Sequence, residues 1–185
     1  MADTARVLWI TGLSGAGKST IAKEIIKSLK AHSVSAVMLD GDVIRDAIND
    51  SNIGHDHQSR LINAYRISRF SKCIAKQGVI VIVATMSLFH EIHEWNRKNI
   101  LRYFEVYLKV DIEVLKRRDP KGLYSRAENN KERNVGGIDL DFEEPVEPDM
   151  TIVNNETMSD FSLIALDIIN QANLLEPYWI KNKKT

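Results

Sequence analysis

The sequence predicts a three-layer α/β fold in which a parallel five-stranded sheet lies between two layers of helices. Three observations lead to this prediction. A short apolar run opens the chain at residues 7–10, a glycine-rich loop joins it to a helical segment, and further apolar runs alternate with helical segments. Strands that alternate with helices form parallel sheets, and ligands bind beyond the carboxyl ends of such strands. The 185 residues are expected to form a single domain over 1–185.

The remaining elements follow from apolar periodicity and from their end signals. The most hydrophobic run, 79–83, is expected to be a central strand of the sheet. The last helix is expected after the capping pattern Thr157-x-x-Asp160 and, being apolar on most faces through Ile169, should be well buried. The other strands are expected at 36–39, 104–110 and 150–153, and the other helices up to about residue 31, from about 43, and at 58–77, 91–101 and 112–118.

Residues 119–149 are polar and contain several prolines and glycines. An irregular stretch of this length in a compact domain is usually functional. The sequence therefore predicts a lid at 119–149, which would place Arg118 and Lys121 at its start.

The glycine-rich loop reads G-x-x-x-x-G-K-S and follows a buried strand directly. In such a phosphate-binding loop (P-loop), glycines let the backbone wrap around a polyphosphate, while N–H groups and the positive end of the next helix face the anion. Lys18 can reach the β- and γ-phosphates, and the Ser19 hydroxyl can ligate Mg²⁺. The nucleotide-binding residues are expected to be Gly12, Leu13, Ser14, Gly15, Ala16, Gly17, Lys18, Ser19 and Thr20.

ATP is the expected nucleotide. A GTP-binding protein would normally carry N-K-x-D, and here Asn130-Lys131 is followed by Glu132-Arg133. Twenty-five basic and twenty-five acidic residues balance, so no global field favours nucleic acid or a membrane surface. No signal peptide or membrane-spanning run is recognised and there is a single cysteine, so a cytoplasmic protein is expected.

Several polar residues are predicted to meet at the same edge of the sheet. Asp40 and Asp42 follow the second strand, and a carboxylate there can hold a metal-bound water or accept a proton from a hydroxyl. Ser87 follows the central strand. Arg45, Arg60, Asn63 and Arg66 could bind anions beside these carboxylates. Taken alone, Asp-Gly can be a plain turn and the arginines a solvated helix face.

The motifs together resemble those of the adenylyl-sulfate (APS) kinases, from about residue 7 to 154. The resemblance rests on the P-loop, on Leu39-Asp40-Gly41-Asp42 with Arg45, on Arg60 with Asn63, on the strand that leads to Ser87, on residues 119–124, and on Gly137-Ile138-Asp139 before Glu143-x-Pro145. It implies a P-loop NTPase fold and Mg²⁺- and ATP-dependent phosphorylation of a nucleotide's ribose 3′-hydroxyl, commonly by a dimer.

The resemblance also implies individual roles. It places Asp40 and Asp42 by the metal and the acceptor hydroxyl, and Arg118 and Lys121 at ATP. Ser87 corresponds to a serine described in the family as a phosphoserine intermediate, although direct in-line transfer needs no covalent step. The acceptor-binding positions are Asp42, Arg45, His55, Arg60, Asn63, Val135 and Ile138.

The sequence departs from the family where the acceptor base would bind. The family usually carries two phenylalanines that sandwich adenine, and the corresponding stretches read Gly54-His55-Asp56 and Arg133-Asn134-Val135-Gly136-Gly137-Ile138. Its usual F-I-S-P is replaced by Thr85-Met86-Ser87-Leu88. Loss of both rings removes a stacking surface for a purine.

These departures resemble a branch of the family that phosphorylates cytidine diphosphoramidate in capsule synthesis. We therefore hold two acceptors open, APS as the family default and cytidine diphosphoramidate as the alternative. A P-loop ATP-binding switch and a non-catalytic paralogue are alternatives from other classes. The Asp40-Gly41-Asp42 turn and the set of arginines speak against the switch, and Lys18, Ser19 and Asp42 speak against the paralogue.

Overall fold

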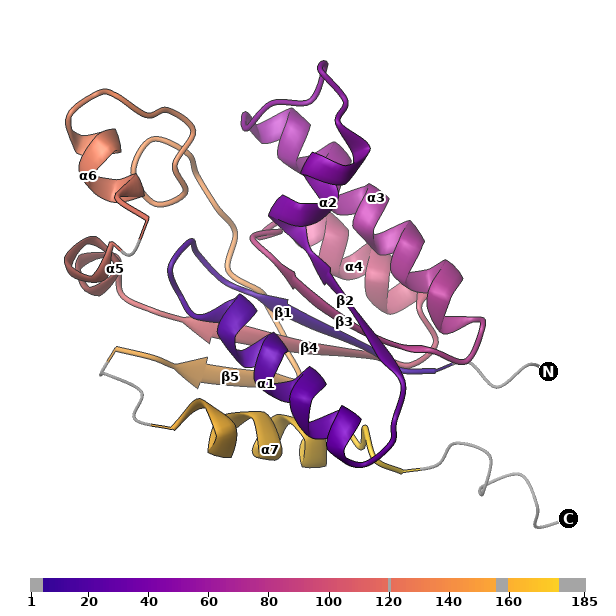
Figure 1. Ribbon diagram of the computed structural model, residues 1–185. Coiled ribbons are helices and arrows are strands. Elements are labelled where there is room, and N and C mark those ends of the chain that lie inside the picture. The colour runs from indigo at the N-terminus through magenta and orange to yellow at the C-terminus, as the bar shows by residue number, and fades with distance from the viewer. Residues whose placement is uncertain (1–4, 120, 156–159, 177–185) are drawn as a thin grey trace, which may run out of the picture.

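The computed structural model describes residues 5–119, 121–155 and 160–176. A parallel sheet lies between two layers of helices, as predicted (Figure 1). Its strands are β1 (Val7–Thr11), β2 (Ala36–Asp40), β3 (Ile80–Thr85), β4 (Tyr103–Lys109) and β5 (Met150–Val153). The helices are α1 (Lys18–Ala31), α2 (Gly41–Ile48), α3 (His57–Ala75), α4 (His90–Asn99), α5 (Ile112–Arg118), α6 (Leu123–Glu128) and α7 (Phe161–Gln171).

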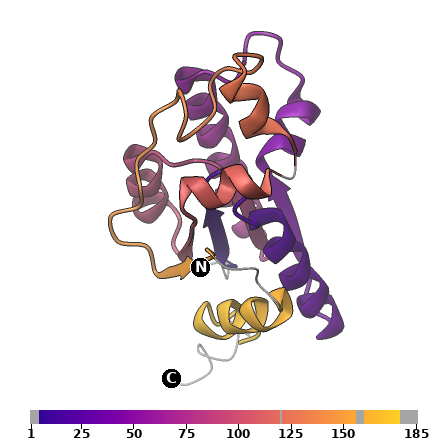
Figure 2. The ribbon, with the colours of Figure 1, turned by 90° about the vertical axis from the view of Figure 1, so that its left-hand side faces the viewer.

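The strand order is β2-β3-β1-β4-β5, with every pairing parallel. The predicted central strand, β3, is an interior strand, while β1 holds the middle position. All carboxyl ends therefore point to one edge of the sheet. Helix α6 and the loop before α3 lie beyond this edge (Figure 2).

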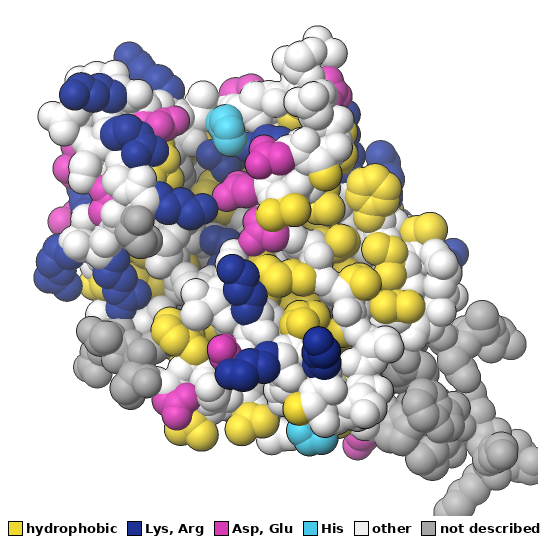
Figure 3. All heavy atoms as spheres, in the orientation of Figure 1, with side chains coloured by type: hydrophobic (Ala, Val, Ile, Leu, Met, Phe, Trp, Pro, Cys, Tyr) yellow, Lys and Arg dark blue, Asp and Glu magenta, His cyan; other side chains and the backbone are white. Residues whose placement is uncertain are grey.

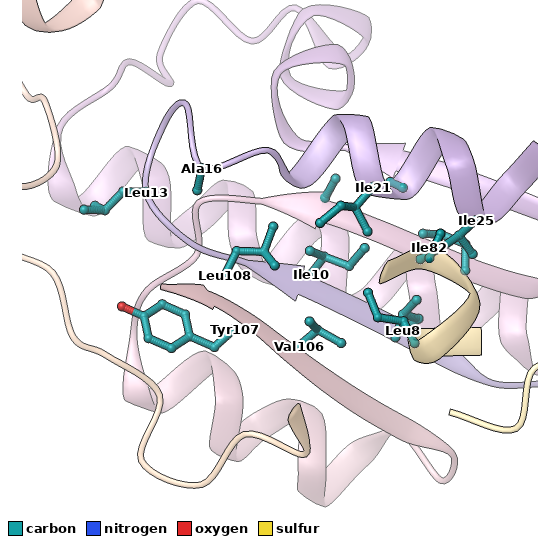
Figure 4. Packing of buried hydrophobic residues seen from close by; sticks show 14 of the residues in the cluster. Leu8, Ile10, Leu13, Ala16, Ile21, Ile25, Ile82, Val106, Tyr107 and Leu108 are labelled. Carbon is teal, nitrogen blue, oxygen red and sulfur yellow. The ribbon is translucent and has the colours of Figure 1, made fainter. Parts of the chain in front are cut away.

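Both faces of the sheet are covered by helices, which is why every residue of β1 is buried. Leu8 and Ile10 belong to the core under α1 and α7, together with Ile21 and Ile25 of α1 (Figure 4). Trp9 points to the other face, into the core that α3 and α4 complete. Alternation along a strand thus supplies two cores from one apolar run.

Two details of the sequence prediction are wrong. Helix α2 begins at Gly41 rather than near Val43, because the Asp40 carboxylate accepts a hydrogen bond from the Asp42 N–H and caps the helix. Helix α7 is not well buried, since Leu163 and Leu166 are exposed and only one side of the helix packs on the core. Its capping side chain is Asp160, and Thr157 lies outside the described residues.

The predicted lid, 119–149, is more ordered than an irregular loop, because it contains α6. The Asp119 carboxylate accepts hydrogen bonds from the N–H groups of Tyr124 and Ser125 and so stabilises the start of this helix. The second half of the lid is attached to the body: Glu143 N–H donates to the Leu88 carbonyl, and Lys109 pairs with Glu144. The first half is attached as well, since the buried Tyr124 donates through its hydroxyl to the Ser14 carbonyl at 2.8 Å.

None of the helices within the described ranges is both long enough and apolar enough to cross a membrane.

Candidate active site

A cavity of about 350 Å³ opens at the carboxyl ends of the strands. Figure 3 shows basic and acidic side chains and a histidine gathered where the surface is hollowed between the α6 side and the α2–α3 side. The glycine-rich loop, the Asp40–Asp42 turn, the start of α3 and the lid segment 132–136 all line this cavity. The structure therefore brings together segments that are more than a hundred residues apart in the sequence, as the sequence analysis expected.

The P-loop has the backbone that a polyphosphate requires. Gly12 has φ +148°, and a Cβ there would lie 2.5 Å from the Leu108 carbonyl oxygen, so a larger residue cannot be accommodated. Gly17, with φ +102°, precedes α1 and provides no side-chain cap, which leaves the first N–H groups of that helix directed at the cavity side.

Lys18 is the basic group of this loop. Its Nζ donates to the Leu13 carbonyl at 2.8 Å, which holds the ammonium against the loop's own backbone. Burial lowers the pKa of Lys18 to about 8, although Asp42 and Asp40 favour the protonated form. The ammonium lines the cavity, where it can bind an anion.

Oxygen ligands for a cation lie beside the lysine. Ser19 Oγ donates to Asp40 Oδ2 at 2.6 Å, and both residues line the cavity. Hydroxyl and carboxylate oxygens are the ligands that Mg²⁺ prefers, so this pair fits a magnesium ion. No group of three His, Cys, Asp or Glu side chains suited to a metal occurs within the described ranges.

Asp42 pairs with a lysine of the lid. Lys121 Nζ is 3.3 Å from Asp42 Oδ2, with both side chains largely exposed. The surrounding cavity wall removes some water from the carboxyl and so favours its protonated form, but Lys121, and after it Arg45 and Lys18, hold the pKa of Asp42 below its usual range. The carboxylate is therefore ionised at neutral pH and can accept a proton or orient a hydroxyl.

The predicted acceptor residues also meet. The Arg45 guanidinium contacts the His55 ring, and Arg60 donates to the His55 carbonyl at 2.7 Å and to the Asn134 carbonyl at 2.9 Å. Burial, followed by the charges of Arg45 and Arg60, lowers the pKa of His55, so its ring is neutral at pH 7. Asn63 donates to the Gly41 carbonyl at 3.3 Å. Arg66 differs from these residues, because it pairs with Asp50 at 2.6 Å and does not line the cavity.

Of the two predicted acceptor residues on the lid, one lines the cavity and the other does not. Val135 lines the cavity and is buried, and its N–H donates to the Asp139 carboxylate. Ile138 is partly exposed and does not line the cavity. Gly136 packs tightly beside Met86, since a Cβ on it would lie 2.8 Å from the Met86 methyl group.

Ser87 lies away from the cavity. Its side chain is buried and Oγ accepts a hydrogen bond from the Trp9 indole at 3.0 Å, while His93 Nε2 is 2.6 Å from the Ser87 carbonyl oxygen. The strand end instead presents Thr85 and Met86 to the cavity. The geometry therefore gives no support to a phosphoserine, and Ser87 stays a sequence prediction.

Three of the nine predicted nucleotide-binding residues of the P-loop lie outside the cavity wall. Gly12, Leu13 and Ala16 do not line the cavity. The other six P-loop residues do, Gly15 and Gly17 through their backbone. Arg118 likewise lies behind the loop, where its guanidinium donates to Asn154 Oδ1 at 3.3 Å.

Sequence reasoning missed two supports of the P-loop. The Asn154 side chain is buried and donates to the Ala16 carbonyl at 3.0 Å, and the Tyr124 hydroxyl donates to the Ser14 carbonyl at 2.8 Å. Asn154 directly follows β5, so the rule that ligand sites gather at strand ends could have found it. Glu132 and Arg133 also line the cavity, and neither was among the predicted site residues.

Comparisons with known proteins agree with this geometry. The family model for adenylylsulphate kinase matches residues 4–153. A cytidine diphosphoramidate kinase of Campylobacter jejuni is 38% identical over 155 residues, covering 84% of this chain and 89% of the relative. An adenylyl-sulfate kinase of Clostridium acetobutylicum is 41% identical over 155 residues, covering 83% of this chain and 76% of the relative.

Among solved structures, the APS kinase of Mycobacterium tuberculosis in complex with AMPPNP and APS superimposes with a TM-score of 0.84 at 30% identity, covering 92% of this chain and 98% of that one. A match of this extent, together with the family model and relatives near 40% identity, establishes more than a shared fold. The protein belongs to the adenylylsulphate kinase family, and it is a kinase.

Proposed function

We propose that this kinase transfers the γ-phosphoryl group of ATP to the ribose 3′-hydroxyl of a small nucleotide. One observation carries the proposal: a single cavity joins a complete phosphate-binding loop to an ionised Asp42 and to Arg45 and Arg60. A phosphoryl donor and an anionic acceptor would thus lie on two sides of one carboxylate. The switch and the non-catalytic paralogue leave this second, acceptor side without a purpose.

On the ATP-binding side of the cavity, the protein would act by binding and neutralising the negative charge of the phosphates. The P-loop backbone and Lys18 would hold the polyphosphate, and Ser19 with Asp40 would hold Mg²⁺, which neutralises phosphate charge when bound. Lys121, on the lid, would add positive charge after leaving Asp42. Catalysis of this kind depends on positioning and electrostatic stabilisation, because the protein itself forms no bond to the phosphoryl group.

The acceptor side would orient one hydroxyl. Asp42 would accept its proton or hydrogen bond, while Arg45 and Arg60 would bind the acceptor's phosphate groups. Asn63 Oδ1 is buried and, among the described residues, has no hydrogen-bond partner. A buried acceptor atom without a partner is costly, so the amide fits a site where a bound ligand donates to it.

Two acceptors fit this scheme. Cytidine diphosphoramidate is favoured by the lining of the cavity, which includes no Phe, Tyr or Trp among the described residues. APS is favoured by the family model and by the named activity of the Clostridium relative. The lack of a ring pair that could hold a purine leads us to place cytidine diphosphoramidate first.

The experiment offers each acceptor separately to the purified full chain with Mg²⁺-ATP and measures ADP formation. We expect turnover with at least one acceptor, and loss of turnover with its 3′-deoxy analogue but not with its 2′-deoxy analogue. ADP formation at background level with both acceptors would contradict the proposal in this form.

The base pocket can be tested by restoring the two rings. In the variant His55→Phe with Val135→Phe, we expect the ratio of kcat/KM for APS to kcat/KM for cytidine diphosphoramidate to rise by about tenfold or more, because base stacking on an aromatic ring contributes ~1–3 kcal/mol. Val135 is buried, so thermal unfolding must be measured alongside. His57→Phe, outside the cavity and in edge contact with Phe89, is the matched control. An unchanged ratio in a folded double variant would refute this account of the base pocket.

The pH dependence should report Lys18. Because only the ammonium form attracts phosphate, we expect kcat/KM for MgATP to fall as the pH rises through about 8, the pKa of Lys18 in the protein. The value of kcat should lack this limb, since bound polyphosphate favours the ammonium form. Lys18→Arg should move the limb to higher pH in any residual activity, and a limb at the same pH in that variant would assign it to another group.

The assembly and location of the protein are also proposals. We propose a homodimer, in line with the resemblance. Val43 and Phe70, exposed on the neighbouring helices α2 and α3, are apolar side chains that a second copy could cover. Light scattering of the purified chain tests this, and a monomer at micromolar concentration would contradict it. A cytoplasmic location and the lack of nucleic-acid or membrane partners remain expectations from composition.

A further inference from the structure

One part of the cavity wall, here called the compartment, is formed by Arg60, His55 and the lid segment 132–136. The Arg60 guanidinium donates to the His55 carbonyl and to the Asn134 carbonyl, and so links the two segments that carry these carbonyls. The lid segment 132–136 and His55 both line the cavity here. Glu132 is close enough that its charge raises the pKa of His55 against the stronger lowering effects of burial and the arginines. The compartment therefore has an imidazole and a carboxylate on its walls.

The Glu132 carboxylate is fixed in orientation. Arg126 Nε lies 3.1 Å from Glu132 Oε2, and Arg126 Nη1 in turn donates to the Lys121 carbonyl at 2.8 Å. The Glu132 side chain is about one-third exposed. Of the acidic side chains on the cavity wall, Asp40 and Asp42 lie at the phosphate end, so Glu132 is the one that the lid supplies.

A carboxylate in this place discriminates between nucleobases. An ionised carboxylate is an acceptor without a proton to give, and it pairs with the exocyclic amino group of a base. A carbonyl at the same position of the base would oppose it with a second acceptor. Sites that hydrogen-bond a substrate N–H reject the analogue that lacks it far more strongly than apolar pockets reject a change of size.

We propose that Glu132 is a specificity-determining residue that selects an amino-pyrimidine nucleotide, cytosine rather than uracil, as the acceptor. This inference rests on the proposed function and deepens it. The neutral His55 ring and Val135 provide a surface for a single ring, and Glu132 accepts a hydrogen bond from the exocyclic amine at its edge. Arg126 sets the angle of the carboxylate and so acts as a positioning residue.

The test compares cytidine diphosphoramidate with its uridine counterpart, using the full chain and Mg²⁺-ATP. In the unmodified protein we expect kcat/KM to favour the cytidine compound by about 10²-fold or more. Glu132→Gln should reduce this preference by about tenfold or more, because the amide can turn its NH₂ group toward the uracil O4. The change should appear in the KM for both acceptors, while the KM for MgATP stays constant.

Glu128→Gln is the matched control. Glu128 lies on α6 of the same lid and pairs with Lys116, outside the cavity, so this variant should keep the full preference. Glu132→Asp keeps the charge and should retain the preference with a higher KM, which gives a second measurement if the glutamine variant is unstable.

The outcomes separate this inference from the function on which it rests. A strong cytidine preference that Glu132→Gln leaves unchanged would refute the role of Glu132 alone. An unmodified protein that phosphorylates both compounds equally would refute it as well. ADP formation with neither these compounds nor APS would overturn the proposed function, and this inference with it.

Discussion

Lys18→Ala is expected to reduce kcat/KM for MgATP by about 10³-fold while leaving the fold intact. The loss follows because the ammonium is the charge that the loop directs at the polyphosphate, and removal of one preorganised group of this kind costs ~2.7–4 kcal/mol of transition-state stabilisation. The fold should survive because Lys18 Nζ contacts only the loop's own Leu13 carbonyl among the hydrogen bonds described. The measurement is steady-state ADP formation with a thermal unfolding curve.

Lys23→Ala provides the control for this prediction. Lys23 lies on the same helix, is exposed, and does not line the cavity. Its removal should change kcat/KM by less than about twofold, as is usual for exposed surface positions. If a folded Lys18→Ala protein kept more than about a tenth of its activity, the assignment of catalysis to the P-loop would be wrong.

Asp42→Asn is expected to lower kcat by about 10²- to 10⁴-fold, the range for loss of a group that accepts a proton in the transition state. Lys121 and the neighbouring cations keep this carboxyl ionised, and the asparagine cannot take up a proton. The KM for the acceptor should change less than kcat, because Arg45 and Arg60 remain to bind it. Initial rates at saturating acceptor measure this directly.

Asp46→Asn makes the same chemical change on the same helix, at an exposed position outside the cavity. We expect it to keep normal turnover. A decrease in kcat of less than about tenfold in a folded Asp42→Asn protein would show that Asp42 does not act on the acceptor hydroxyl.

The strands of the sheet could be predicted from the sequence alone. All five strands lie within about two residues of their predicted bounds, because short apolar runs buried on both faces leave an unambiguous pattern. Helix α6 escaped prediction for the opposite reason. Six residues are too few to establish a period, and this helix depends on the buried Tyr124 and on hydrogen bonds to Asp119.

Burial was predicted less well than secondary structure. Phe70 continues the apolar spacing of α3 and Leu166 that of α7, yet both are exposed. An apolar period shows that a helix is formed but does not show how wide a face its neighbours cover. Only the packing of α7 against α1, and of α3 against β3, determines which side chains are covered.

The sequence by itself was enough to predict that the P-loop, Asp40, Asp42, Arg45, Arg60 and Asn63 line one cavity. Local motifs and strand ends indicate which polar side chains lie at the carboxyl edge of a parallel sheet. Tertiary structure decided the rest. In the folded chain the Ser87 hydroxyl accepts a hydrogen bond from Trp9 and lies outside the cavity lining. Asn154 and Tyr124 donate to carbonyls of the P-loop, and Glu132 lines the same cavity as His55. These are contacts between distant segments, and they depend on side-chain direction and loop path, which no local pattern encodes.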